Sequence, residues 1–307
     1  MELRQLQALI AIADHGSFSA AATALSTVQS NVSSHMARLE RELGVQLVDR
    51  PTGQLTEEGA AVLERARRIC SEIEATVADV AALRHDISGT ARIGMIGTTA
   101  RWLAPLLLDR MGEVHPRVRL VIGDGTSATL EPLLAAGSLD AALVLLPHSN
   151  PDLVEKALFS EDLVLVVAPD HPLADRDRVR MSDLDGLSLL LPAPGTNFRQ
   201  EIEWACRNAG VTLNPLAELD GVRLIASLCL RGYGPAILPA TGASEGGGYS
   251  RIGIEGMPLR RVGLVLRRRG RPSAPARAML EVLERVVGAN LDPKRGLHPP
   301  VGTPPAA

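Results

Sequence analysis

Short apolar segments alternate with helical segments along the chain from Ala91 onward. The apolar segments read RIGMIG, VRLVIG, AALVLL, LVLVVA, LSLLL, AILP and VGLVLR. Helical patterns such as TLEPLLAAGSL and NFRQEIEWACRNAG lie between them. This alternation predicts an α/β domain with mostly parallel strands. In such sheets ligands bind beyond the carboxyl ends of the strands, beside helix N-termini.

A long helix is predicted upstream of this domain, from Glu57 to about Arg84. Its apolar residues recur every three or four positions, as in helices that pair with another helix; they are Val62, Ala66, Ile69, Ile73, Val77 and Val80. The helix either forms a dimer or packs on its own domain. The segment HDISGT that follows it reads as a linker, which favours dimerisation.

The N-terminal segment predicts two short helices and then a third that begins near Val28. Gly16 ends the first helix, Ser17 caps the second, and Ser26 and Thr27 separate the second from the third. The segment VQLVDRPTGQLT then predicts a β-hairpin wing around a Pro-Thr-Gly turn. This pattern is a helix-turn-helix, and both DNA binding and an ordinary three-helix bundle remain open on these features.

The third helix has an unusual outer face. One apolar stripe is expected to face inward; it consists of Val28, Val32, Met36, Leu39 and Leu43. The opposite side carries serines, where an ordinary solvated helix would carry Glu and Lys because they form helix better. This composition indicates a surface that serves another purpose than solvation.

Composition narrows the function classes. Apolar residues make up 46% of the 307 residues and charged residues 22%, which is typical of a globular chain with a large core. The formal net charge of −3 and the acidic N-terminal segment argue against nucleic acid on charge alone. The three cysteines are widely spaced and form no CxxC pair, so neither a metal site nor a disulfide framework is expected. No signal peptide, membrane span or cofactor motif is present, so a cytoplasmic protein is expected.

An enzyme and an exported solute-binding protein are the alternatives. The chain contains no GxSxG, GxGxxG, P-loop or HExxH motif, so no catalytic residue is assigned and an enzyme is not expected. A solute-binding protein would share the α/β fold, but it would be exported and would lack a helix-turn-helix.

Taken together, the chain resembles the LysR-type transcriptional regulators. The residues that carry the resemblance are Gly16-Ser17-Phe18, Ala21-Ala22, Leu25, Gln29-Ser30, Val32-Ser33, Leu39-Glu40, Leu43-Gly44, Leu47, Arg50, Leu55-Thr56, Gly59, Arg92-Ile93-Gly94, Pro105, His115-Pro116, Gly137, Leu139-Asp140, His171-Pro172-Leu173-Ala174, Ala209-Gly210 and GYGPAILP. The resemblance covers the chain up to about Asn290.

The resemblance implies an α plus α/β protein. A winged helix-turn-helix is expected over residues 1–58, a linker and dimerisation helix over 59–88, and a periplasmic-binding-protein-like effector domain over 91–292. The effector domain would have two subdomains, the first of about 91–162 and 268–292 and the second of about 163–267, with a disordered tail over 293–307. The expected partners are double-stranded DNA, a small organic effector and further copies of the chain, as a homodimer or homotetramer.

The resemblance also identifies the helix that enters the major groove, which accounts for its serines. Short side chains let the backbone come close to the bases, and Gln and Asn can contact adenine through two hydrogen bonds. The candidate DNA-binding residues are Gln29, Ser30, Asn31, Ser33, Ser34, His35, Arg38 and Arg50. Glu40 and Glu42 predict that only the N-terminal half of the helix enters the groove. Val28 stands where the family has Ser or Thr, so the N-cap is expected at Thr27 or Ser26.

The effector is expected between the two subdomains. By resemblance, the candidate effector-binding residues are Thr98, Thr99, Thr126, Ser127, Thr196, Asn197 and Phe198. Hydroxyl groups and free helix amides suit a small organic anion such as a carboxylate, although the same residue types are also common helix caps. The peroxide-sensing branch carries a reactive cysteine where this chain has Asn197, so a thiol switch of that kind is not expected. Cys206, at the position of that branch's second cysteine, is expected to be a buried apolar residue.

Overall fold

The computed structural model describes residues 1–84, 87–243 and 248–301. The N-terminal domain consists of three helices and a small wing. The helices are α1 (Leu3–His15), α2 (Phe18–Ala24) and α3 (Gln29–Leu43). An antiparallel bridge between Val48 and Leu55 forms the wing. Alanines on α2 let the three helices pack closely around a shared apolar core.

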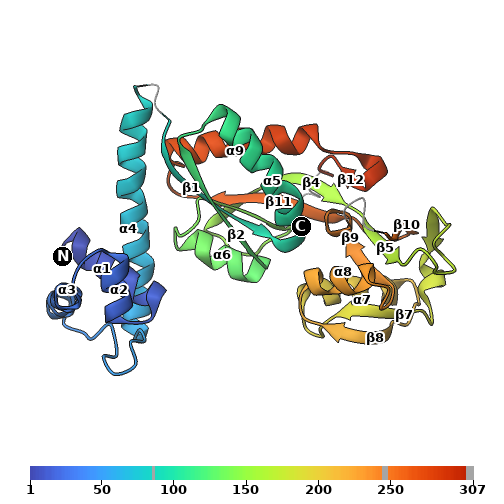
Figure 1. Ribbon diagram of the computed structural model, residues 1–307, viewed down its shortest axis with the longest axis horizontal. Coiled ribbons are helices and arrows are strands. Elements are labelled where there is room, and N and C mark those ends of the chain that lie inside the picture. Colours follow the sequence, from blue (N-terminus) through green and yellow to red (C-terminus); the bar gives the residue numbers. More distant parts are fainter. Residues whose placement is uncertain (85–86, 244–247, 302–307) are drawn as a thin grey trace.

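Helix α4 (Glu57–Ala82) connects this domain to the rest of the chain. The Thr56 hydroxyl accepts a hydrogen bond from the Gly59 amide and caps the helix. Gly59 lies so close to the wing that a Cβ there would be 2.0 Å from the Leu47 carbonyl oxygen. In Figure 1 the helix stands beside the effector domain, with the N-terminal domain at its lower end. Residues 85–86 of the expected linker lie outside the described residues.

The rest of the chain forms two six-stranded sheets with helices on their faces. The first has the order β12-β4-β11-β3-β1-β2 and the second β6-β10-β5-β9-β7-β8. The strands are β1 (Gly89–Ile96), β2 (Val118–Gly125), β3 (Ala141–Leu145), β4 (Leu153–Glu161), β5 (Leu163–Val167), β6 (Arg178–Arg180), β7 (Ser188–Pro192), β8 (Asn214–Leu219), β9 (Ala236–Pro239), β10 (Ser250–Glu255), β11 (Arg260–Arg267) and β12 (Leu297–His298). The helices are α5 (Gly97–Val114), α6 (Ser127–Ala135), α7 (Asn197–Asn208), α8 (Val222–Leu230) and α9 (Ala274–Ala289), with 3-10 turns η1 (Met181–Leu184), η2 (Ala240–Gly242) and η3 (Pro293–Arg295).

The chain passes between the two sheets twice. The first crossing lies at Asp162, between β4 and β5, where it was expected. The second lies between β10 and β11, so the expected limit of the second subdomain at residue 267 is wrong. Strand β11 belongs to the first sheet because its apolar side chains complete that core between β3 and β4. Strands β4, β5 and β11 run antiparallel to their neighbours, whereas β10 runs antiparallel to β5 and parallel to β6. Both sheets are therefore mixed, which corrects the expectation of mostly parallel strands.

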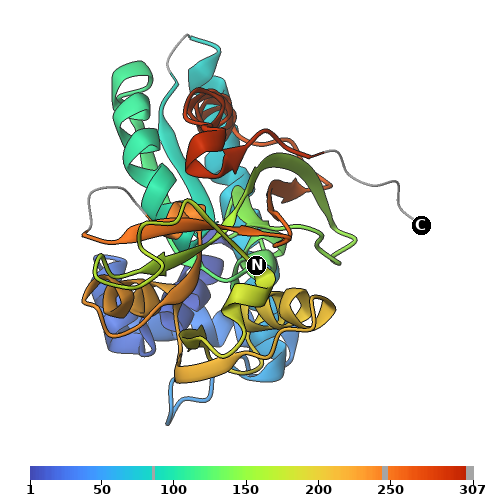
Figure 2. The same ribbon diagram turned by 90° about the vertical axis from the view of Figure 1, so that its right-hand side faces the viewer.

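The C-terminal segment is more ordered than expected. A disordered tail was predicted from residue 293, but residues 293–301 fold back along the first sheet, where β12 pairs with β4. The buried side chain of Leu297 anchors this segment, and the Asp162 amide donates to the Gly296 carbonyl. Residues 302–307 lie outside the described part of the chain. Figure 2 shows α9, in red, close to the upper part of α4, where the Ala274 amide donates to Asp79.

Candidate functional site

Helix α3 presents the predicted polar face to the outside. Val32, Met36 and Leu39 are fully buried against α1 and α2, as the stripe predicted. Val28 and Leu43, at the two ends of the stripe, are 59% and 42% exposed, so their predicted burial is wrong. Both lie beyond the helices that α3 packs against. The N-terminal end of α3 therefore projects from the domain.

The candidate DNA-binding residues lie together on this face and on the wing. Six of them are exposed, and Ser33 and His35 are half-buried; the exposed ones are Gln29, Ser30, Asn31, Ser34, Arg38 and Arg50. Val28 occupies the N-cap position and offers no side-chain hydrogen bond, which corrects the predicted cap. The Thr27 hydroxyl instead accepts a hydrogen bond from the side-chain amide nitrogen Nδ2 of Asn31 at 3.0 Å. The first turn of α3 therefore keeps free backbone amides that could face phosphate.

Arg50 is held between the wing and α3. Its guanidinium lies 3.4 Å from the Ser33 hydroxyl and 3.5 Å from Glu40. The other carboxylate oxygen of Glu40 accepts hydrogen bonds from the Leu47 and Val48 amides. Glu40 thus serves the wing, and its charge is offset by Arg50 at the edge of the outer face. An Arg at this edge suits contact with a phosphate.

A cavity of about 520 Å³ lies between the two subdomains. The N-terminal residues of four helices line it: α5 and α6 from the first subdomain, and α7 and α8 from the second. Free amides and the positive ends of helix dipoles therefore converge on one space. This arrangement favours a bound anion.

Six of the seven candidate effector residues line this cavity; they are Thr98, Thr126, Ser127, Thr196, Asn197 and Phe198. Thr99 does not line it. Its side chain is fully buried on the other side of α5, and its hydroxyl has no partner among the described residues. Successive residues of a helix point about 100° apart, and this rotation turns the Thr99 side chain away from the cavity that Thr98 lines.

Charged residues that sequence reasoning did not place at the site also line the cavity. Arg223, at the start of α8, lies 2.8 Å from Asp124, at the end of β2, so this ion pair joins the two subdomains. Asp220 precedes α8 on the same rim. Only the topology shows that Asp124 faces Arg223.

Arg260 is the buried cation of the site. Its guanidinium lies 3.1 Å from Glu161 and 3.2 Å from Glu201, and it stacks 5.0 Å from the ring centroid of Phe198. Glu161 is fully buried and also accepts from the amide and hydroxyl of Thr241. Burial raises the pKa of Glu201 above its usual value, although Arg260 opposes this shift. No sequence motif marks Arg260. It lies at the start of β11, and only the second crossing of the chain between the sheets brings this position to the cavity.

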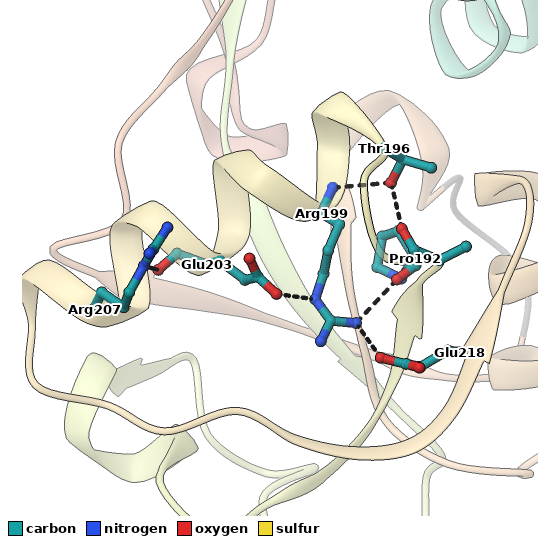
Figure 3. Close-up of polar contacts among 7 residues, drawn as sticks. Pro192, Thr196, Arg199, Glu203, Arg207 and Glu218 are labelled. Carbon is teal, nitrogen blue, oxygen red and sulfur yellow. Dashed lines mark hydrogen bonds and ion pairs between the residues drawn. The ribbon is translucent and has the colours of Figure 1, made fainter.

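Arg199, in the first turn of α7, is a buried arginine that stabilises the fold. Figure 3 shows its guanidinium bonded to Glu203 on its own helix, at 2.7 Å, and to Glu218 on β8, at 3.0 Å. It also donates to the Pro192 carbonyl at the end of β7. Arg199 is buried and ties α7 to the sheet, so it does not face the cavity.

Comparisons with known proteins agree with this architecture. A family model of the LysR substrate binding domain matches residues 84–288, and a model of the bacterial regulatory helix-turn-helix protein, lysR family, matches residues 3–60. The chain belongs to the LysR family. This confirms the predicted resemblance and fold class, and it makes the chain a DNA-binding transcription regulator rather than an enzyme.

Relatives and solved structures similar to this LysR-type chain include peroxide-inducible regulators. A "Probable hydrogen peroxide-inducible genes activator" of Mycobacterium avium is 34% identical over 85% of this chain and 86% of its own length. The "DNA-binding transcriptional dual regulator OxyR" of Escherichia coli is 28% identical over 95% of this chain and 96% of its own. The structure of full-length CbnR with its target DNA is 25% identical, with a TM-score of 0.70, over 93% of this chain and 100% of that one.

The cysteines of this LysR-type chain are buried or half-buried. Cys206 lies on the buried face of α7, in the core of the second subdomain, and burial raises its thiol pKa to about 11. Burial also raises the pKa of Cys229 to about 11. Asn197, nine positions before Cys206, is exposed at the cavity. Among the described residues, no group of His, Cys, Asp and Glu could hold a metal ion, and no helix is long and apolar enough to cross a membrane.

Proposed function

We propose that this regulator binds a specific DNA sequence through the N-terminal half of α3. The exposed hydroxyls of Ser30 and Ser34 are short enough to let the helix backbone approach base edges. Gln29 and Asn31 extend beside them with amide groups that can contact adenine, and Arg38 and Arg50 can contact phosphate. A DNA partner is also the reason to infer a cytoplasmic location.

A substitution on this face tests the orientation of α3. Ser33→Arg fills the surface that would approach the bases, so we expect specific binding to be lost while the fold is retained. Gly112→Arg adds the same charge on α5, where a side chain would meet open space, and should leave binding unchanged. The measurement is fluorescence anisotropy with the intergenic DNA upstream of the protein's own gene, in scrambled competitor at fixed salt. Specific binding retained by Ser33→Arg would show that another face contacts DNA.

We propose that a small organic anion, such as a carboxylate, binds between the subdomains and controls the regulator. The observation that carries this proposal is the convergence of four helix N-termini on one cavity. Arg223 and Arg260 also line the cavity, each already paired with carboxylates, and threonine and serine hydroxyls supply further donors. An anion that contacts both walls would change the relative placing of the subdomains, and through them of the DNA-binding domains.

Two neighbouring threonines provide a matched test of this site. Thr98 lines the cavity and Thr99 does not, and both are buried on α5. A carboxylate that raises the melting temperature of the full chain should lose most of this effect with Thr98→Val and keep it with Thr99→Val. At about 100 times its dissociation constant a ligand stabilises the folded state by about 2.7 kcal/mol, which a thermal shift detects readily. Equal losses in both variants would contradict the proposed site.

Peroxide sensing is the second candidate function, because the similar relatives named above are peroxide-inducible activators. Thiol oxidation by peroxide requires an accessible thiolate. Cys206 is buried with a raised pKa, and the exposed position at the start of α7 is occupied by Asn197. We therefore expect peroxide to leave the intact mass and the DNA affinity unchanged under conditions that oxidise a low-pKa thiol. A disulfide or sulfenic acid at Cys206 would favour the peroxide function instead.

We also propose that α4 pairs with α4 of a second copy, giving a homodimer or homotetramer. Ile69, Ile73, Val77 and Val80 repeat along the helix and are 39–67% exposed. Water-exposed apolar residues at this spacing are typical of a helix–helix interface. Light scattering should show a monomer for Val77→Glu and the assembly for Val77→Leu; an assembly in both would place the interface elsewhere.

A further inference from the structure

Two adjacent arginines of α4 join the effector domain to the DNA-binding domain. Arg67 donates to the Ser138 hydroxyl at 3.0 Å and forms an ion pair with Asp14 of α1. Arg68 donates from Nε and Nη2 to the Ala135 carbonyl, the first of these at 2.9 Å. One arginine thus bridges both domains, and its neighbour binds the end of α6.

Helix α6 connects this contact to the cavity. At its N-terminus, Thr126 caps the helix and Ser127 and Ala128 line the cavity. At its C-terminus, the Ala135 carbonyl receives Arg68. The helix is about 13 Å long. Both a cation and a hydrogen-bond donor stabilise the carbonyl end of a helix, because the last carbonyls have no partner within it.

The packing around α6 leaves little room for independent movement. Leu130 and Leu134 are buried in the core of the first sheet. Beyond the helix, Gly137 has φ +75°, and a Cβ there would lie 3.1 Å from the Arg68 side chain. The turn at the end of α6 therefore fits directly against α4. A shift of one end of this helix must displace the other end or break these contacts.

The structure assigns Arg67 and Arg68 as positioning residues that couple the cavity to the DNA-binding domain through α6. Occupation of the cavity at Ser127 and Ala128 displaces α6 and alters its contact with Arg68. Arg67 passes the change to Asp14 on α1, which packs against the DNA-contacting helix α3. This inference extends the proposed effector control, and it rests on that proposal because an effector in the cavity is what would displace α6.

Hydrogen exchange of the full chain, with no DNA and no ligand, tests the contact itself. Arg67→Met with Arg68→Met removes the contacts to Asp14, which is exposed, and to the carbonyl of Ala135, which is half-buried, so we expect the fold to be preserved. We expect exchange in residues 12–16 and 133–139 to rise about threefold to tenfold. Arg65→Met is the matched control, since Arg65 is exposed on the same helix and the structure gives it no partner among the described residues. Equal exchange in the double variant and the control would overturn the inference.

A variant that fills the cavity with a side chain tests the coupling in the absence of an effector. Ala128→Phe places a ring in the cavity, and we expect it to change exchange in residues 12–16 in the parent chain but not in the Arg67→Met, Arg68→Met background. A change that persists without the arginines, or one that stays confined to α6 in the parent, would overturn the coupling. Failure of the effector proposal can be distinguished from failure of the coupling. In the first case carboxylates would not stabilise the chain, but the hydrogen-exchange differences between the variants would still be observed.

Discussion

Replacing Arg260 by Met should expose how the buried charges at the second crossing stabilise the protein. Arg260 is 6% exposed and is placed between the carboxylates of Glu161 and Glu201. Met retains most of the side-chain volume and its contact with Phe198, so the variant removes charge and hydrogen bonds rather than packing. Glu161, which is fully buried, keeps hydrogen bonds from the amide and hydroxyl of Thr241.

The magnitude follows from the burial of these groups. Breaking a buried ion pair by removing one partner costs about 3–5 kcal/mol, since the remaining charge is uncompensated. In a domain of this size each kcal/mol lowers the melting temperature by about 2–4 °C, so a fall of about 6–20 °C is expected. Arg261, the next residue, is half-buried and has unpartnered Nε and Nη2 atoms among the described residues. Arg261→Met is therefore the matched control and should change stability by less than about 1 kcal/mol.

The loss should depend on pH in a defined direction. Burial raises the pKa of Glu201, and the charge of Arg260 opposes that rise. Without Arg260 the folded-state pKa of Glu201 moves further above its unfolded value. Such a carboxyl group stabilises the fold below the unfolded value and loses this contribution as pH rises through the folded one. The stability difference between variant and parent should therefore grow above about pH 4.5.

The assay is thermal or urea unfolding of the full chain, followed by circular dichroism at several pH values. Adding Glu161→Gln to Arg260→Met should recover part of the lost stability, because it removes the buried charge. A loss of less than about 1 kcal/mol at pH 7, or one that does not vary with pH, would refute the reasoning.

Three further changes test the domain interface, the wing and the C-terminal segment. Gly59→Ala would place a Cβ 2.0 Å from the Leu47 carbonyl oxygen, so the N-terminal domain should lose about 2–4 kcal/mol on urea unfolding, while Gly112→Ala on open α5 should lose nothing. Glu40→Ala removes the acceptor of the Leu47 amide, 3.0 Å away, and should cost about 1–3 kcal/mol and weaken DNA affinity; unchanged anisotropy would contradict this role. Removing residues 292–307 uncovers the β4 edge and should lower the effector-domain melting temperature; an unchanged one would show that β12 adds nothing.

The periodicity of apolar residues predicted the inward-facing side of α3 correctly, but not how far along the helix that side is buried. Val32, Met36 and Leu39 are buried as predicted, because each faces α1 or α2. Val28 and Leu43 follow the same period but extend past those partners. The period of apolar residues predicts which face of a helix points inward. Burial of a given residue also requires a neighbouring element at that point along the helix.

Most strands found from sequence are buried on both faces, although the edge strand β2 is not. Strand β5, for example, is buried at every position. Strands β4 and β8 escaped notice since charged or exposed residues interrupt them, and β4 carries exposed residues along its first half. The end of the second subdomain was misplaced for a related reason. Apolar content identified β11 as a strand, but nothing local shows which of two sheets a strand joins.

The hydroxyl residues of the cavity were predictable and its charged residues were not. Resemblance to the family pointed to Thr98, Ser127 and Thr196, and each of them lines the cavity at or beside the start of a helix. Arg260 and Asp124 come from strands that meet at the cavity only after the chain has crossed twice. Their roles depend on topology, so no local pattern could have marked them.

The two ion pairs at the cavity contribute unequally to the placing of the subdomains. The Arg223–Asp124 pair joins the rims, but Arg223 is 68% exposed, so the pair is screened and contributes about 0–1 kcal/mol. The buried cluster of Glu161, Arg260 and Glu201 spans the crossing and resists change. The proposed anion would therefore have to displace only the weak Arg223–Asp124 pair at the rim, while the buried cluster stays in place. Since about 1.4 kcal/mol of differential binding shifts a two-state equilibrium tenfold, one new contact between the proposed anion and both rims would be enough to change the subdomain placing.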